Sequence, residues 1–177
     1  MTDQALPNKS LNNISESDLL RIPSYLLAPV QSYLKNADIK KIERAYTFAF
    51  IAHDGQKRKD GSAYISHPVA VAKIVAELQM DPDSICAALM HDVIEDCDVP
   101  KTVLEKNFGS DVANIVDGVS KLGKIKMQNK AETNANNFQK MALAMANDVR
   151  VILVKLCDRV HNMRTIDFMP RHKQIIK

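Results

Sequence analysis

The sequence contains few of the residues that disulfide scaffolds, membrane proteins and turn-rich β proteins need. Its three cysteines, Cys86, Cys97 and Cys157, include no C-x-x-C pair, which suits a reducing compartment and gives no sign of a zinc finger or a redox motif. Five glycines and seven prolines among 177 residues argue against a β protein with many turns. No apolar run approaches the ~20 residues of a membrane span, and no signal peptide is visible. We therefore expect a cytoplasmic protein with no membrane partner.

Basic residues only slightly outnumber acidic ones. The formal net charge is +3, which is too small to indicate nucleic-acid binding from bulk charge, so no nucleic-acid partner is expected. The apolar fraction of 46% and the charged fraction of 25% are ordinary for a globular protein. The length allows one domain with a core that needs no disulfides.

Apolar residues recur at spacings of three and four through most of the chain, which predicts an all-α fold of six to nine helices with no significant sheet. Residues 1–22 are polar and aperiodic, so we expect a leader there and a domain over 23–177. Asp38, Asp81 and Asp148 are the predicted N-caps. Residues 151–154 alone could form a strand, but no turn signal follows them and a helix is preferred. The predicted helices cover 38–53, 67–79, 82–96, 100–108, 110–122, 134–146 and 149–163.

Residues 89–96, Leu-Met-His-Asp-Val-Ile-Glu-Asp, contain four side chains that bind metals or move protons. If this stretch is helical, Glu95 lies four residues after His91, and Asp96 lies four after Asp92. Residues at this spacing share one face of a helix. Three carboxylates on one face repel one another, and a bound cation would offset that repulsion.

Two distant residues extend this set of possible metal ligands. His67 lies at the predicted start of a helix, and Asp158 follows an apolar run that predicts burial. Together with His91 and Asp92 they would form a mixed nitrogen and oxygen site. Such a site favours Mn, Fe or Zn over Ca or Mg, which prefer oxygen ligands. Glu95 and Asp96 would then remain free beside the metal.

Five strings in the sequence resemble, in order and spacing, the N-terminal hydrolase domain of the RelA/SpoT family of HD-type phosphohydrolases, and most of all its bifunctional SpoT-type members. The HD doublet alone is weakly specific, but five linked strings make a chance match improbable. The resemblance covers roughly residues 38–170. The strings are AHDGQKRKDG at 52–61, YISHP at 64–68, LMHDVIED at 89–96, GVSKL at 118–122 and DRVHNMRT at 158–165.

The resemblance implies an all-helical hydrolase that removes the 3′-pyrophosphate from (p)ppGpp with a bound Mn²⁺. It also implies that this domain is cut short at its C-terminal end and that synthetase and regulatory domains belong to the full-length protein. Water activated at the metal and oriented by the catalytic pair would attack the phosphorus attached to the 3′ oxygen. The implied metal ligands are His67, His91, Asp92 and Asp158, the catalytic pair is Glu95 and Asp96, and the substrate-binding residues are Arg58, Lys59, Asn162 and Thr165.

Two other functions remain open, a phosphohydrolase of another nucleotide and a non-catalytic module that binds nucleotides. The loop with Arg58 and Lys59 and the face with Asn162 and Thr165 argue against another nucleotide. The four implied metal ligands and the catalytic pair are all intact, which argues against the module. His53 and His161 match no ligand position, so core or supporting roles are expected for them. The lysine-rich stretch 121–130 is interpreted as a solvated loop, with Lys121 and Lys126 as candidate phosphate contacts.

Overall fold

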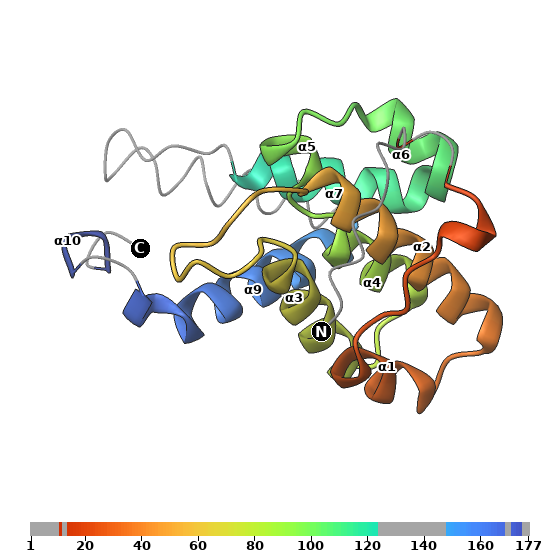
Figure 1. Cartoon of the computed structure of the whole chain (residues 1–177), viewed down its shortest axis with the longest axis horizontal. Helices are drawn as coiled ribbons and strands as arrows, with labels where there is room; N and C mark the ends of the chain where they lie inside the picture. The colour runs from red at the N-terminus through yellow and green to blue at the C-terminus, as the bar shows by residue number, and fades with distance from the viewer. Residues whose placement is uncertain (1–10, 12–13, 124–147, 169–170, 175–177) are drawn as a thin grey trace.

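The computed structural model describes residues 11, 14–123, 148–168 and 171–174, and these form a helical bundle (Figure 1). In this part of the chain no strand occurs, and one isolated bridge joins Lys57 to Ala63, so the all-α prediction is confirmed. None of the described helices is long and apolar enough to cross a membrane. The elements are η1 (Glu16–Asp18), α1 (Ser24–Gln31), α2 (Asn36–Ala52), α3 (Ser66–Glu77), α4 (Pro82–Leu89), α5 (Val93–Asp96), α6 (Lys101–Phe108), α7 (Ser110–Gly123), α9 (Val149–Arg164), η2 (Ile166–Phe168) and α10 (Arg171–Gln174). The predicted helix at 134–146 and Lys124, Lys126 and Lys130 lie outside the described residues.

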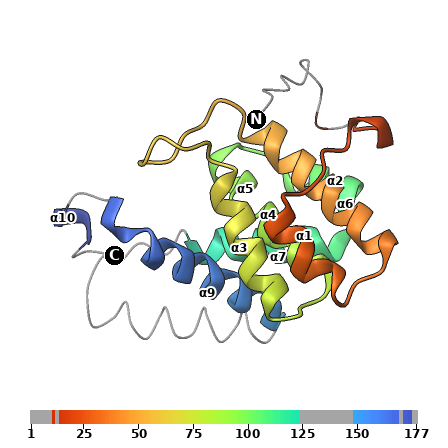
Figure 2. The ribbon, with the colours of Figure 1, turned by 60° about the horizontal axis from the view of Figure 1, so that its bottom comes forward.

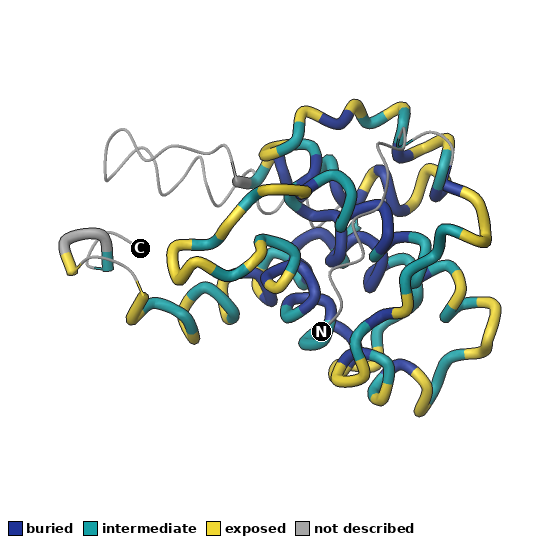
Figure 3. The backbone as a smooth tube through the Cα atoms, viewed as in Figure 1, coloured by how far each residue is buried: buried dark blue, intermediate teal, exposed yellow. Residues whose placement is uncertain are grey.

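Helix α4 forms the centre of the core. Its residues 84–89 are all buried, and it packs against α2, α3, α7 and α9. Its residues 85–89 are apolar on all sides, and such a segment belongs in the interior. Buried backbone gathers in the middle of the molecule (Figure 3), and α3 and α9 run side by side next to it (Figure 2). Helices α3, α4 and α9 therefore meet in the core and bring together residues that are distant in the sequence.

Two of the three predicted N-caps are confirmed. The carboxylates of Asp81 and Asp148 accept hydrogen bonds from backbone N–H groups in the first turns of α4 and α9. The prediction for Asp38 is wrong, because α2 begins two residues earlier, at Asn36. Asp38 instead reaches back and accepts a hydrogen bond from the Lys35 N–H at 3.3 Å. A carboxylate inside the first turn can satisfy an unpaired N–H as a cap does.

The predicted continuous helix through 82–96 is also wrong, because α4 ends at Leu89 and α5 begins at Val93. Met90, His91 and Asp92 form a turn between the two helices. Successive residues of a continuous helix point about 100° apart, whereas this turn brings Asp92 Oδ2 to 3.0 Å from His91 Nε2. The break therefore lets the two side chains face the same point.

The basic loop between α2 and α3 is a closed turn. The Arg58 N–H donates to the Ser62 carbonyl at 2.8 Å, and Gly61 takes a φ of +84°, where glycine is unstrained. The Asp60 carboxylate accepts hydrogen bonds from both the N–H and the hydroxyl of Ser62. Asp60 therefore stabilises its own turn, which presents the neighbouring basic side chains.

Gly118 allows α7 to pack closely on α9. A Cβ at this position would lie 2.8 Å and 3.0 Å from the two γ-carbons of Val151. We expect Gly118→Ala to lower the free energy of unfolding by about 1–2 kcal/mol, because the overlap outweighs the better helix propensity of alanine. Urea denaturation measures this. In a Val151→Ala background the cost should vanish, and a cost that persists there would contradict the close approach.

Candidate metal centre

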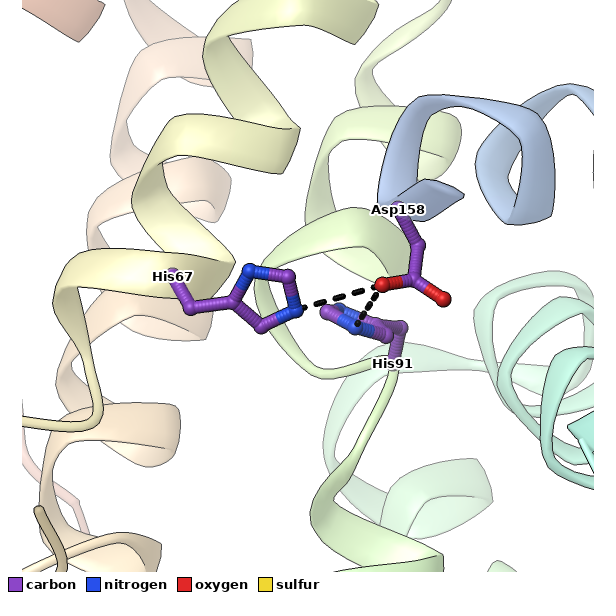
Figure 4. Close-up of side chains that lie close together, drawn as sticks. All are labelled: His67, His91 and Asp158. Atoms are coloured by element: carbon purple, nitrogen blue, oxygen red, sulfur yellow. Dashed lines mark ion pairs between the residues drawn. The ribbon is translucent and has the colours of Figure 1, made fainter. Parts of the chain in front are cut away.

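Four side chains from three parts of the fold meet in the core. His67 comes from the first turn of α3, His91 and Asp92 from the α4–α5 turn, and Asp158 from the middle of α9. Figure 4 shows His67 and His91 both directed at the Asp158 carboxylate. Its Oδ1 lies 3.3 Å from His67 Nε2 and 3.9 Å from His91 Nε2. Candidate ligand atoms of His67, His91 and Asp158 lie within 4.8 Å of one another, so these residues could hold one metal ion.

The protonation of His91 supports a cation at this point. Its Nδ1 lies 2.9 Å from the Ala88 carbonyl, which can only accept, so Nδ1 carries the proton. In the neutral imidazole the lone pair of Nε2 faces the oxygens of Asp92 and Asp158, and this buried nitrogen has no hydrogen-bond partner among the described residues. Burial lowers the pKa of His91, but the two carboxylates raise it overall, so positive charge is favoured at this point. Lone pairs that converge in a buried site need a positive species between them. A divalent metal fits that requirement.

Electrostatics in the cluster favour ionised carboxylates. Burial alone would raise the pKa of Asp92, but positive charge on the adjacent His91 and the hydrogen bond from the Tyr64 hydroxyl hold it well below its usual value. The pKa of Asp158 is also lowered, in spite of burial, mainly by its contact with His67. Burial lowers the pKa of His67, so this imidazole is neutral and able to bind a metal. Two negative charges are therefore available to offset a divalent cation.

Tyr64 connects the cluster to α5. Its hydroxyl lies 2.8 Å from Asp92 Oδ2 and 2.7 Å from Asp96 Oδ2, and its ring stacks on His53 with centroids 4.6 Å apart. Burial, together with the charge of Asp92, raises the pKa of Tyr64, so the hydroxyl keeps its proton. The sequence interpretation gave Tyr64 no role. The available signal was its position three residues before His67.

The predicted catalytic pair, Glu95 and Asp96, lies beside the cluster. Both are exposed on α5 and line a cavity of about 260 Å³ together with His67, Asp92 and Asp158. Lys155 and Arg159 line the same cavity, and Lys155 Nζ lies 3.1 Å from Asp158 Oδ2. Sequence reasoning missed these two cations, although their spacing of four residues places them on one face of α9. The cavity thus has acidic and basic walls.

All four predicted substrate-binding residues line a second cavity, of about 210 Å³, together with Phe168, which was not predicted. Arg58 Nη2 lies 3.4 Å from Thr165 Oγ1, which joins the basic loop to the end of α9. Asn162 also donates a hydrogen bond to Asp158 Oδ1, so it serves the metal cluster as well. The two cavities adjoin, because Arg58, Tyr64 and Asn162 line both.

The supporting role expected for His161 has a definite partner. His161 Nδ1 lies 2.7 Å from His67 Nδ1, and burial, with the nearby His67 and Arg58, lowers the pKa of His161 to about 4. Lys121, in contrast, is bonded to Asp117 at 2.7 Å with a largely exposed side chain. It lines neither cavity, while Lys126 lies outside the described residues.

Comparison with known proteins gives consistent similarities. The family model of the HD domain matches residues 45–176. The chain is 54% identical over 136 residues to the guanosine-3′,5′-bis(diphosphate) 3′-pyrophosphohydrolase of Vibrio cholerae, which covers 77% of this chain and 19% of that protein. It is 52% identical over 137 residues to the bifunctional (p)ppGpp synthase/hydrolase SpoT of Escherichia coli K12, covering 77% and 20%.

A solved structure is also similar. It is that of a metazoan ortholog of SpoT that hydrolyses ppGpp, with a TM-score of 0.62 and 26% identity, covering 80% of this chain and 79% of the other. The chain spans about a fifth of the length of the two curated bacterial relatives.

Proposed function

The chain belongs to the HD-domain family, and from that premise we propose that it hydrolyses (p)ppGpp with a bound Mn²⁺ and releases the 3′-pyrophosphate to leave GDP or GTP. The observation that carries this proposal is the junction of the two cavities. One is lined by residues of the metal cluster together with Glu95 and Asp96, and the other by polar and aromatic side chains suited to a nucleoside. A nucleotide with a 3′-diphosphate would occupy both.

The relatives support this choice of substrate. The Vibrio cholerae protein is named for 3′-pyrophosphohydrolysis of guanosine bis(diphosphate), and the metazoan protein hydrolyses ppGpp. The curated relatives are about five times longer, so we propose that synthetase and regulatory domains accompany this domain in the full-length protein. We also propose that it acts in the cytoplasm, in keeping with its three free cysteines.

In this proposal His67 and His91 bind the metal through Nε2, and Asp92 and Asp158 bind it through carboxylate oxygens. The mixed donor set suits Mn²⁺, as it does Fe²⁺ or Zn²⁺, better than it suits Ca²⁺ or Mg²⁺. Bound there, the metal would polarise a phosphoryl oxygen and lower the pKa of a bound water. Asn162 and Lys155 contact Asp158 and would hold its carboxylate in place.

The remaining steps belong to side chains of this chain. Glu95 takes a proton from the attacking water, and Asp96, held by Tyr64, orients that water. The water oxygen bonds to the phosphorus next to the 3′ oxygen, and the bond between that phosphorus and the 3′ oxygen breaks. The 3′ oxygen then takes up a proton and pyrophosphate leaves. Lys155 and Arg159 line the same cavity as Glu95 and Asp96 and would stabilise the charge of the leaving diphosphate.

In the second cavity Arg58 contributes a planar cation. Its guanidinium carbon lies 6.0 Å from the centre of the Tyr64 ring, which limits its freedom before a ligand arrives. Such a guanidinium can stack on a nucleobase or contact a phosphate. Thr165 and Asn162 would meet the ribose and the base, and Lys59 would meet the 5′-phosphates.

Substrate choice is tested by incubating the purified chain and Mn²⁺ with ppGpp and, separately, with dGTP. We expect GDP and pyrophosphate from ppGpp and no product from dGTP. Hydrolysis of dGTP at a comparable rate would indicate a phosphohydrolase of another nucleotide. Binding of ppGpp without release of pyrophosphate would indicate a non-catalytic module.

Removal of one hydroxyl group tests the link between the metal cluster and Asp96. Tyr64→Phe keeps the ring and its stacking on His53 but removes the donor to the carboxylates. We expect kcat for ppGpp to fall about tenfold with little change in KM, since a hydrogen bond to a charged group contributes about 1.5–3 kcal/mol. The control is Tyr33→Phe, because the Tyr33 hydroxyl donates to the Met80 carbonyl and lines neither cavity. An unchanged kcat in Tyr64→Phe would exclude this role.

A further inference from the structure

We propose that His161 is a positioning residue that selects the tautomer of His67 able to bind the metal, and that it thereby sets the metal affinity of the site. This inference rests on the metal centre of the proposed function, but it does not depend on which nucleotide is hydrolysed.

Helix α9 approaches both nitrogens of the His67 ring. Asp158 Oδ1 lies 3.3 Å from Nε2, and His161 Nδ1 lies 2.7 Å from Nδ1. Asp158 and His161 are three residues apart on α9, so they project from the same face of the helix. The rings of His67 and His161 have centroids 4.8 Å apart and are tilted by 40°. In Figure 4 the second nitrogen of His67 points away from Asp158 and His91.

A hydrogen bond between two imidazole nitrogens needs one donor and one acceptor, and only one assignment leaves His67 free to bind a metal. If His161 donates, the proton of neutral His67 lies on Nε2 and points at Asp158, where the ion would bind. If His67 donates from Nδ1, its Nε2 lone pair is free. His161 must then accept through Nδ1 and carry its own proton on Nε2.

The two metal-binding histidines therefore differ in how their tautomers are fixed. The partner of His91 Nδ1 is the Ala88 carbonyl, which can only accept. The partner of His67 is a second imidazole, which can donate or accept. Partners that orient metal-binding histidines typically change metal affinity by about 10–100-fold when they are removed. A replacement of His161 should therefore alter metal affinity according to whether it still offers an acceptor.

Two variants separate positioning from simple packing. His161→Asn keeps a carbonyl oxygen close to the place of Nδ1, whereas His161→Leu keeps a similar volume without an acceptor. The probe is MnCl₂ added to the purified chain after removal of metal, with binding followed by calorimetry and by the electron paramagnetic resonance signal of free Mn²⁺. Thermal unfolding in EDTA reports the stability of each metal-free variant.

We expect the Leu variant to bind Mn²⁺ about 10–100-fold more weakly than the parent, and the Asn variant to bind it within about threefold of the parent. Unfolding temperatures in EDTA should be similar for both. Parental affinity in the Leu variant would overturn the proposal. Equal losses of affinity in both variants, with lower stability, would show a packing role instead. No Mn²⁺ binding by the parent would overturn the proposed Mn²⁺ site and, with it, this role of His161.

Discussion

Replacement of Glu95 by Gln is expected to lower kcat for ppGpp by about 10²–10⁴-fold, the range that general acid–base catalysis contributes, while Mn²⁺ still binds. Glu95 is exposed on α5 and lines the cavity that contains the metal cluster. Its carboxylate makes no hydrogen bond or ion pair within the part of the chain that the structure describes. It is therefore free to accept a proton from water. Glutamine keeps its size but removes its basicity.

The measurement pairs pyrophosphate release with a Mn²⁺ titration of the same protein. The matched control is Glu105→Gln on α6, where the carboxylate is paired with Lys101 at 3.5 Å and lines neither cavity. Glu105→Gln should keep the parental rate of pyrophosphate release and the parental Mn²⁺ affinity. Full turnover in Glu95→Gln with Mn²⁺ bound would exclude the proposed base. Loss of Mn²⁺ binding would show that Glu95 is a ligand, contrary to the proposed separation of ligands and base.

Replacement of Asp158 by Asn is expected to weaken Mn²⁺ binding by more than about 100-fold, because the loss of a direct ligand should cost more than the loss of a supporting residue. Pyrophosphate release should fall to background for the same reason. The Asp158 carboxylate is buried and faces the Nε2 atoms of both His67 and His91. Asparagine keeps its shape but lacks the negative charge that offsets the cation.

Asp83→Asn is the control for this change, because Asp83 is an acidic residue paired with Lys41 at 2.6 Å and lines neither cavity. Its Mn²⁺ affinity should equal that of the parent. The Mn²⁺ affinities of Asp158→Asn and Asp83→Asn are measured by calorimetric titration of the metal-free proteins. Parental affinity in Asp158→Asn would mean that the ion binds elsewhere, and the role proposed for the cluster would then be wrong.

Local signals were sufficient for most of the helices. Asp81 followed by Pro82 marks the start of α4, and Asp148 marks the start of α9, because caps act on N–H groups within a few residues. The break after Leu89 had no such signal. The spacing of 89–96 suits a continuous helix, and the turn at His91 depends on contacts with distant residues that are not encoded in the stretch itself.

The candidate site, like the helices, could be predicted from the sequence only in part. The order of the histidines and acids in the sequence was enough to predict that His91, Asp92 and Asp158 lie close to His67. Spacing places Tyr64 close to His67 and Lys155 on one face of α9 with Arg159. It does not show which residues Tyr64, His161 and Lys155 contact, because that depends on which helices pack together. Tyr64 contacts carboxylates 28 and 32 residues away in sequence. His161 lies 94 residues from the imidazole that it contacts.

Pyrophosphate release from ppGpp, measured on the chain stripped of metal with EDTA and then resupplied with Mn²⁺, tests metal-dependent hydrolysis most directly. We expect no release before Mn²⁺ is added, and equimolar GDP and pyrophosphate afterwards. Release at the same rate in excess EDTA would contradict the metal centre. Mn²⁺ and ppGpp both bound, with no pyrophosphate formed, would contradict catalysis by this chain.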